Sequence, residues 1–338
     1  MIENFFKKKR VFSAIQPSGN LTIGNYISVL KYWKNMQKKY DCIFCIADLH
    51  SLTSISKNFD HFLNNSILDT LSLYLACGVN PRKSIVFLQS MIPEHTQLNW
   101  ILNNYVYVQE LMRMTQFKSK SKLLKNSKIN SGILNYPILM ASDILLYDTD
   151  LVHVGKDQIQ HIELSKKIAN RFNKIHGKIF KIPNFLIFNQ GIKIMSLLNP
   201  NKKMSKSDIN KKNSIFLLDD LEVLKNKVNS AITDSDVPAK IIFDPINKPG
   251  ISNLLVILSS ITKLSILDIE QKFFKKNYKS FKKFFYFCMF SFLKNLQKKF
   301  LKYRKDENKL KKILNLGMKK ISFLAKSKIN KIFNTLYK

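Results

Sequence analysis

The amino-acid sequence predicts an α/β fold, in which a parallel sheet with helices is followed by an all-helical C-terminal region. Short apolar runs typical of strands alternate with segments of helical apolar spacing up to about residue 208, and helical spacing alone follows. This alternation is typical of a parallel sheet with right-handed crossovers. We therefore expect two domains, residues 1–208 and 209–338, with a helical insertion at about 94–150 in the first.

The first predicted unit joins a short buried strand, residues 11–15, to a helix that begins near residues 22–25. Because the first amides of a helix lack partners within it, such a junction can bind an anion. Gly24 has no side chain, so a nucleotide can approach the backbone there. An ordinary strand, turn and helix explains these residues at least equally well. The helix is predicted by apolar residues at three- and four-residue spacing, namely Ile23, Ile27, Leu30, Trp33, Met36 and Tyr40.

The next predicted strands are residues 42–47 and 85–88, with a helix at 62–77 between them. Asp48 and His50 follow the first of these strands, where open α/β sheets place ligands. For His50, a capped loop residue and a ligand-binding residue are about equally good interpretations.

Cys42 and Cys45 have the C-x-x-C spacing of a redox or metal motif. Residues three apart on a strand face opposite sides, so we expect core cysteines in a reducing cytoplasm. Neither a secretion signal nor an apolar run of about 20 residues is visible, which also favours a cytoplasmic protein.

The middle of the chain departs from the alternation of strands and helices. We expect a helix at 98–114, a mobile basic loop at 118–128 and an apolar helix at 133–147. Asp143 lies in the apolar part of that last helix, and burying a carboxylate costs free energy unless a hydrogen-bond donor meets it. Its donor can be a structural N–H group or a ligand N–H group.

A second strand–glycine–helix junction follows the predicted strand at 151–154. It contains Gly155, Lys156, Asp157 and Gln158, and an acid after a strand can bind a ribose hydroxyl. Further on, residues 203–207 have the sequence Lys-Met-Ser-Lys-Ser. In a chain so rich in lysine this segment is a moderate signal alone, and its position after two glycine junctions strengthens it.

The net charge of +33 (56 Lys and Arg against 23 Asp and Glu) favours a polyanionic partner, nucleic acid first. Part of this charge reflects a lysine-rich composition, so many lysines are solvated surface. After Glu270 the acids are Asp306 and Glu307 alone, against many lysines with interleaved Phe and Tyr. This pattern suits a helical RNA-binding domain.

Together these stretches resemble the class I aminoacyl-tRNA synthetases, and within them the tryptophan-specific branch, from Phe12 to at least Leu255. Residues 203–207 match the lysine–serine motif of the class, and Thr22-Ile23-Gly24-Asn25 is similar to the form of the helix mouth in that branch. The resemblance implies a Rossmann-like nucleotide-binding domain and a C-terminal anticodon-binding domain. It also implies ATP-dependent activation of L-tryptophan, transfer to tRNA(Trp), Mg²⁺ carried by the ATP, no metal site in the protein, and a homodimer formed through residues 80–150.

The resemblance assigns roles residue by residue. It implies that ATP is bound by Gln16, Pro17, Ser18, Gly24, Asn25, Gly155, Lys156, Asp157, Ile194, Lys203, Met204, Ser205, Lys206 and Ser207. It implies that tryptophan is bound by Phe12, Tyr136, Met140, Asp143, Val152, Val154 and Gln158, with Asp143 accepting from the indole N–H. It implies a catalytic set of Thr22, Asn25, Lys120, Lys203, Ser205 and Lys206. Three positions depart from the pattern: Ala14, His153 and Lys156 stand where glycine, proline and glutamate are usual.

Three rival interpretations remain at the level of sequence. The tyrosine-specific branch shares the architecture, and another nucleotidyltransferase can also use a glycine turn with a lysine–serine loop. A non-catalytic basic RNA-binding protein explains the charge, but it leaves the pairing of the first junction with residues 203–207 as coincidence.

Overall fold

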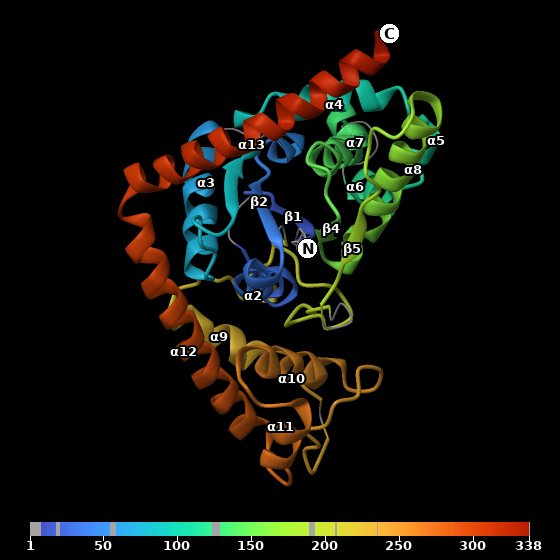
Figure 1. Ribbon diagram of the computed structural model, residues 1–338. Coiled ribbons are helices and arrows are strands. Elements are labelled where there is room, and N and C mark those ends of the chain that lie inside the picture. Colours follow the sequence, from blue (N-terminus) through green and yellow to red (C-terminus); the bar gives the residue numbers. More distant parts are fainter. Residues whose placement is uncertain are drawn as a thin grey trace, which may run out of the picture.

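A parallel five-stranded sheet forms the centre of the described part of the molecule (Figure 1). The computed structural model describes residues 8–17, 21–54, 59–123, 129–188, 193–206, 208–234 and 236–337. The strands have the spatial order β3-β2-β1-β4-β5, and every neighbouring pair is parallel. They are β1 (Arg10–Ile15), β2 (Asp41–Ile46), β3 (Ile85–Leu88), β4 (Leu151–His153) and β5 (Asn184–Leu186).

The predicted α/β fold and its first four strands are confirmed. The sequence did not indicate β5, which is three residues long and begins with exposed Asn184 and Phe185. The chain runs outward from β1 through β2 to β3 and then returns to the other side of β1 as β4, with Phe12 opposite Val152. In such sheets the ligand crevice lies beyond the carboxyl ends of the strands at this reversal, here β1 and β4.

Helices cover the sheet; the first C-terminal helices lie apart from it, and the last one returns across it (Figure 1). Around the sheet lie α1 (Ile23–Asn25), the π-helical turn η1 (Tyr26–Leu30), α2 (Lys31–Lys39), α3 (Phe59–Ala76), α4 (Glu94–Asn103), α5 (Val108–Met112), α6 (Thr115–Leu123), α7 (Ser131–Leu145) and α8 (Ile159–His176), with short 3₁₀ turns η2 (Leu49–Ser54), η3 (Gln89–Met91) and η4 (Lys156–Gln158). After the turn η6 (Lys211–Asn213) come α9 (Leu221–Ser230), α10 (Pro249–Ile261), α11 (Ile266–Lys272), α12 (Tyr278–Arg304) and α13 (Glu307–Leu336).

Two predictions for the middle of the chain are wrong. The single helix expected at 98–114 is two helices, α4 and α5. The basic loop expected at 118–128 is helical as far as residue 123, and residues 124–128 lie outside the described part. Phe117 packs against the core, and Thr115 is hydrogen-bonded through both its amide and its hydroxyl to Gln160 of α8. These tertiary contacts stabilise a helix that the lysine-rich sequence alone did not indicate.

The two cysteines of the C-x-x-C spacing face opposite sides of the sheet, as expected. Cys42 belongs to one hydrophobic cluster and Cys45 to the other, and all four thiols of the chain are free. Burial raises the pKa of Cys42 to about 12, so its thiol stays protonated and inert near neutral pH.

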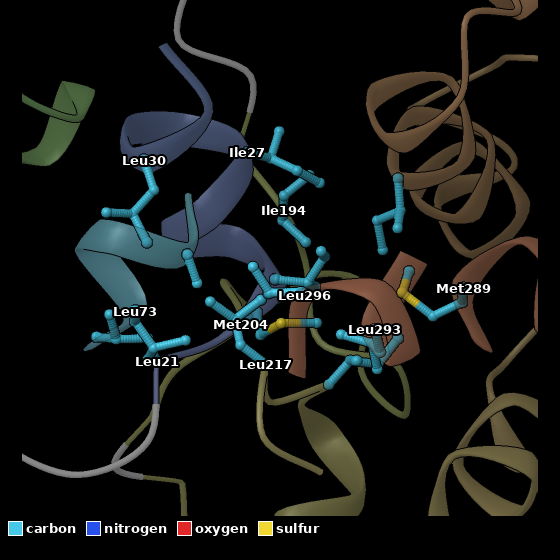
Figure 2. Packing of buried hydrophobic residues seen from close by; sticks show 14 of the residues in the cluster. Leu21, Ile27, Leu30, Leu73, Ile194, Met204, Leu217, Met289, Leu293 and Leu296 are labelled. Atoms are coloured by element: carbon cyan, nitrogen blue, oxygen red, sulfur yellow. The ribbon is translucent and has the colours of Figure 1, made fainter. Parts of the chain in front are cut away.

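The C-terminal helices are anchored to the α/β part at two places. Leu293 and Leu296 of α12 pack with Leu21, Ile194 and Met204 in one cluster (Figure 2). Helix α13 then crosses β3, where Gly317 lies so close that a Cβ atom would come within 1.7 Å of the Val86 carbonyl oxygen. The domain boundary at residue 208 stays a prediction. Helix α13 belongs to the second predicted domain but packs against β3 of the first.

Among the described residues, no single helix is long and apolar enough to cross a membrane. Helices α10 and α11 are so only when taken together, and the chain bends by 113° between them.

Candidate active site

A cavity of about 310 Å³ opens beyond the carboxyl ends of β1 and β4. Its walls come from both glycine junctions, from α7 and from the lysine–serine segment, although these are far apart in the sequence. The predicted site residues that line it are Phe12, Gln16, Thr22, Gly24, Asn25, Tyr136, Met140, Asp143, Val152, Val154, Gly155, Lys156, Asp157, Gln158, Ile194, Lys203, Met204 and Lys206. The fold therefore brings together most of the residues that the sequence selected.

Five selected residues are not placed in the cavity wall. Pro17 and Ser205 are described but do not line the cavity. Ser18 and Ser207 lie outside the described residues, and Lys120 belongs to α6 but its side chain is outside the description. The assignments of these five stay predictions.

The cavity is also lined by residues that sequence reasoning did not select. The polar ones are Ser28, His50, Thr53, Gln116, His153 and Lys193. His50 carried a signal, because it follows a strand of the sheet, but its two interpretations were evenly balanced. Gln116 carried none, since its neighbours resemble an ordinary basic helix or loop.

At the first junction, a capping box of Thr22 and Asn25 occupies the N-terminus of α1. The side-chain carbonyl of Asn25 accepts from the Thr22 amide at 2.9 Å and from the Thr22 hydroxyl at 3.1 Å. The Asn25 amide donates to the Thr22 carbonyl at 3.0 Å, and the Ile23 amide donates to Ile215 at 2.8 Å. The expectation that the first amides are open to an anion is therefore wrong for Ile23 and Asn25.

Charged groups gather at the second junction and the lysine–serine segment. The Lys203 ammonium lies 2.8 Å from one carboxylate oxygen of Asp157, and the Gln158 amide donates to the other oxygen at 2.9 Å. Burial opposes the charge, but Lys203 outweighs it and lowers the pKa of Asp157. A Cβ atom on Gly155 would lie 2.9 Å from the same carboxylate, so a larger residue there would displace the Asp157 side chain.

Lys206 reaches across to the first junction, where its ammonium donates to the Gln16 carbonyl at 3.2 Å. Two lysines of one short segment thus face the two glycine junctions from the same side of the cavity. Between them Met204 packs into the core of Figure 2 with 5% of its surface exposed, which anchors the segment. Ammonium groups carried on an anchored loop are suited to bind phosphate groups.

Asp143 forms the opposite, buried end of the cavity. Its carboxylate accepts from Gln89 at 2.7 Å and lies 2.9 Å from His50 Nε2 and 2.7 Å from His95 Nδ1. Burial by itself would raise the pKa of Asp143, but the hydrogen bonds from His50 and His95 outweigh it and lower the pKa to about 2. The structure therefore supplies protein donors to this acid, and the carboxylate is ionised at neutral pH.

Two further buried side chains line the cavity: Tyr136 of α7, near His50, and His153 of β4, which packs against α2. The Tyr136 hydroxyl donates to Gln116 at 3.2 Å and lies 3.1 Å from His161 Nε2, and burial raises its pKa to about 12. His153, one of the three departures, is buried beside Tyr32 and Phe188, and its Nδ1 accepts from the Trp33 indole at 3.2 Å. Burial lowers the pKa of His153 to about 4, so its imidazole is neutral near pH 7.

Comparison with known proteins agrees with this arrangement. A tryptophan–tRNA ligase of Buchnera aphidicola from Schizaphis graminum is 54% identical over 97% of this chain and 98% of its own. A tryptophanyl-tRNA synthetase structure from Mycoplasma pneumoniae superimposes with a TM-score of 0.90 at 32% identity, over 98% of each chain. Another from Campylobacter jejuni, complexed with ADP and tryptophan, has a TM-score of 0.80 at 31% identity, over 97% of this chain and all of its own. The family model of the class I tRNA synthetases (W and Y) matches residues 6–294, and the chain belongs to that family.

Proposed function

We propose that this chain activates L-tryptophan with ATP in the cavity described above and then transfers the tryptophanyl group to tRNA(Trp). Its activity is that of a tryptophan–tRNA ligase, as the 54% identity over nearly the whole chain indicates. The observation that carries the proposed site is the single cavity that joins an ionised, buried Asp143 to the ammonium groups of Lys203 and Lys206.

The reaction needs positioning and charge neutralisation rather than a protein nucleophile. The carboxylate of the amino acid attacks the α-phosphorus of ATP in line, the bond to the bridging oxygen breaks, and pyrophosphate leaves with the electron pair. Because the attacking group is already charged, no general base is required. Lys203 and Lys206 neutralise the charge that develops on the phosphates, a contribution that acts mainly in the transition state.

At the other end, Asp143 accepts a hydrogen bond from the indole N–H of the substrate. An apolar analogue such as phenylalanine leaves the buried carboxylate without that donor, and sites of this kind reject the analogue by roughly 10⁴–10⁵-fold. Phe12, Met140, Val152 and Val154 supply the apolar wall against the ring, and Tyr136 and Gln158 hold the amino-acid head group.

ATP enters as its Mg²⁺ complex. The presence of ADP in the Campylobacter jejuni relative supports a nucleotide at this site. Among the residues proposed for it, Gly155 and Asp157 line the ribose and Ile194 lines the base. Lys120 of α6 is proposed for the pyrophosphate by family resemblance alone.

The proposed assembly is a homodimer that works in the cytoplasm. Exposed apolar side chains on and next to α4 and α5 support the dimer: Trp100 is 76% exposed, and Tyr107, Val108 and Met112, which follow it in the sequence, are also exposed. Sedimentation of a Val108→Asp variant tests the dimer, because a charge among these apolar side chains should give a monomer.

The lysine-rich helices after residue 209 are the proposed surface for the tRNA anticodon.

Amino-acid-dependent exchange of pyrophosphate into ATP tests the activity itself. We expect exchange with tryptophan and little with tyrosine when both are assayed in parallel. Preferential exchange with tyrosine would favour the tyrosine-specific branch, and no exchange with either would favour a non-catalytic RNA-binding protein.

A further inference from the structure

Three side chains surround Asp143 on the side away from the cavity. Gln89 follows β3, His95 is in the first turn of α4, and Tyr147 follows α7. Each is at most 1% exposed, and none of the three lines the cavity. A ligand in the cavity therefore does not touch them, and they reach it through Asp143 and through Phe12, on which the Tyr147 ring stacks at 6.2 Å.

The three side chains are in close polar contact in series, and the series ends on one carboxylate oxygen. Tyr147 places its hydroxyl 2.7 Å from His95 Nε2, and His95 Nδ1 lies 2.7 Å from Asp143 Oδ1. The Gln89 amide donates to the same Oδ1 at 2.7 Å. The side-chain carbonyl of Gln89 accepts from the Leu49 amide at 3.1 Å, which fixes the orientation of the amide.

The direction of these bonds follows from the donors and acceptors present. An ionised carboxylate can only accept, so the nitrogen of His95 that faces Asp143 can only act on it as a donor. Gln89 donates to Oδ1, and His95 Nδ1 lies 2.7 Å from the same oxygen. His50 fills one position of Oδ2 at 2.9 Å, which leaves that oxygen capacity for one further donor.

We propose that Gln89, His95 and Tyr147 are positioning residues that hold Asp143 so that its Oδ2 presents one acceptor position to the N–H group of the substrate ring. This inference rests on the proposed function, in which Asp143 meets the indole. Tyr147 contacts His95, and His95 and Gln89 hold Oδ1, so this oxygen is held by side chains that do not line the cavity.

The surrounding rings limit movement of this set. His95 stacks on Phe87 with ring centroids 5.9 Å apart, and Tyr147 meets the edge of the same ring at 5.8 Å. Phe87 belongs to β3, at the edge of the sheet that α13 covers. The core therefore holds His95 and Tyr147 in place, as a fixed orientation of the Asp143 carboxylate requires.

The test compares tryptophan with L-3-benzothienylalanine, in which sulfur replaces the indole N–H, in pyrophosphate exchange by the full-length chain. Tyr147→Phe removes one hydroxyl, and we expect kcat/KM for tryptophan to fall about tenfold because one hydrogen bond near 1.4 kcal/mol is lost. His95→Leu should cost about 100-fold. His95→Asn should stay within about tenfold of the unmodified chain, because its Nδ2 can replace the imidazole Nδ1 as donor to Asp143. With benzothienylalanine, each variant should stay within about threefold of the unmodified chain.

The substrate pair separates a positioning role from general damage. Equal losses on both substrates, while the unmodified chain prefers tryptophan, would overturn this inference alone. Equal use of the two substrates by the unmodified chain would instead overturn recognition by Asp143, and the inference with it. Thermal unfolding of each variant checks the fold, and Tyr147→Phe keeps the test open if His95→Leu does not fold.

Discussion

The two ends of the cavity are built on opposite physical principles. At one end Asp143 is 2% exposed and is held by donors from three separate elements. At the other end Lys203 is 52% exposed and pairs with Asp157, which is 40% exposed. The first end excludes water, so its hydrogen bonds are strong and their loss is costly. The second end is solvated, so its ion pair contributes little to stability.

This difference matches the two tasks of the proposed reaction. Recognition of a ring N–H needs an acceptor whose direction is set before the ligand arrives. Transfer of the adenylyl group needs positive charge beside the phosphates as pyrophosphate leaves. Substitutions at the buried end should therefore change both substrate choice and folding, whereas substitutions at the exposed end should change rate with little effect on folding.

The largest expected effect comes from Asp143→Ala. The preference for tryptophan over phenylalanine in pyrophosphate exchange should fall by about 10⁴-fold, because the acceptor is lost. The free energy of unfolding should also fall by about 1–3 kcal/mol, because buried donors of Gln89 and His95 lose their partner. Glu163→Ala, on the exposed side of α8, is the matched control and should change neither. A variant that still selects tryptophan would contradict the proposed role.

Lys206→Ala tests the exposed end. The rate of adenylate formation should fall by about 10²–10³-fold, since one preorganised positive group is lost from the transition state. Tryptophan affinity, measured by calorimetry, and thermal stability should stay unchanged. Lys212→Ala, a nearby exposed lysine, is the control. A large loss of tryptophan affinity at an unchanged rate would show that the two ends do not divide the work in this way.

A separate buried group, His153 on β4, is tested by the pH dependence of stability. Its pKa is about 4 in the folded protein, below the ordinary value of 6.5, so the unfolded chain binds the proton more readily. Its contribution to stability is therefore complete above pH 6.5 and is lost as the pH falls towards 4. At pH 5 the loss is about 2 kcal/mol relative to pH 7.

Urea unfolding of the unmodified chain and of His153→Asn at pH 7 and pH 5 measures this loss. Asparagine keeps an acceptor for Trp33 but does not titrate, so its destabilisation at pH 5 should be smaller by that amount. An identical pH response in the two chains would mean that His153 does not contribute.

The smallest effect is expected for Asp157→Asn. Breaking the half-exposed pair with Lys203 should change the free energy of unfolding by less than about 1 kcal/mol. Chemical denaturation at low and at high salt measures it, and salt should reduce even this difference. A change of several kcal/mol would remove the contrast between the two ends.

Local pattern was sufficient for much of the fold and of the site. The first four strands follow from short apolar runs, because strand formation depends on the side chains of neighbouring residues. Both glycine junctions and residues 203–207 were selected by residue type and order, and most of their members line the cavity. The opposite faces of Cys42 and Cys45 follow from the two-residue period of a strand.

Contacts between distant residues decided the rest. His50 and Asp143 are 93 residues apart and Lys206 and Gln16 are 190 apart, so no local pattern predicts their hydrogen bonds. The closed capping box at Thr22, the helix at residues 115–123 and the return of α13 to β3 likewise depend on packing partners. The sequence by itself determined the first four strands and most of the residues that line the cavity. The tertiary structure alone decided which donors meet each charge, because a buried charge takes its partners from whatever the fold places beside it.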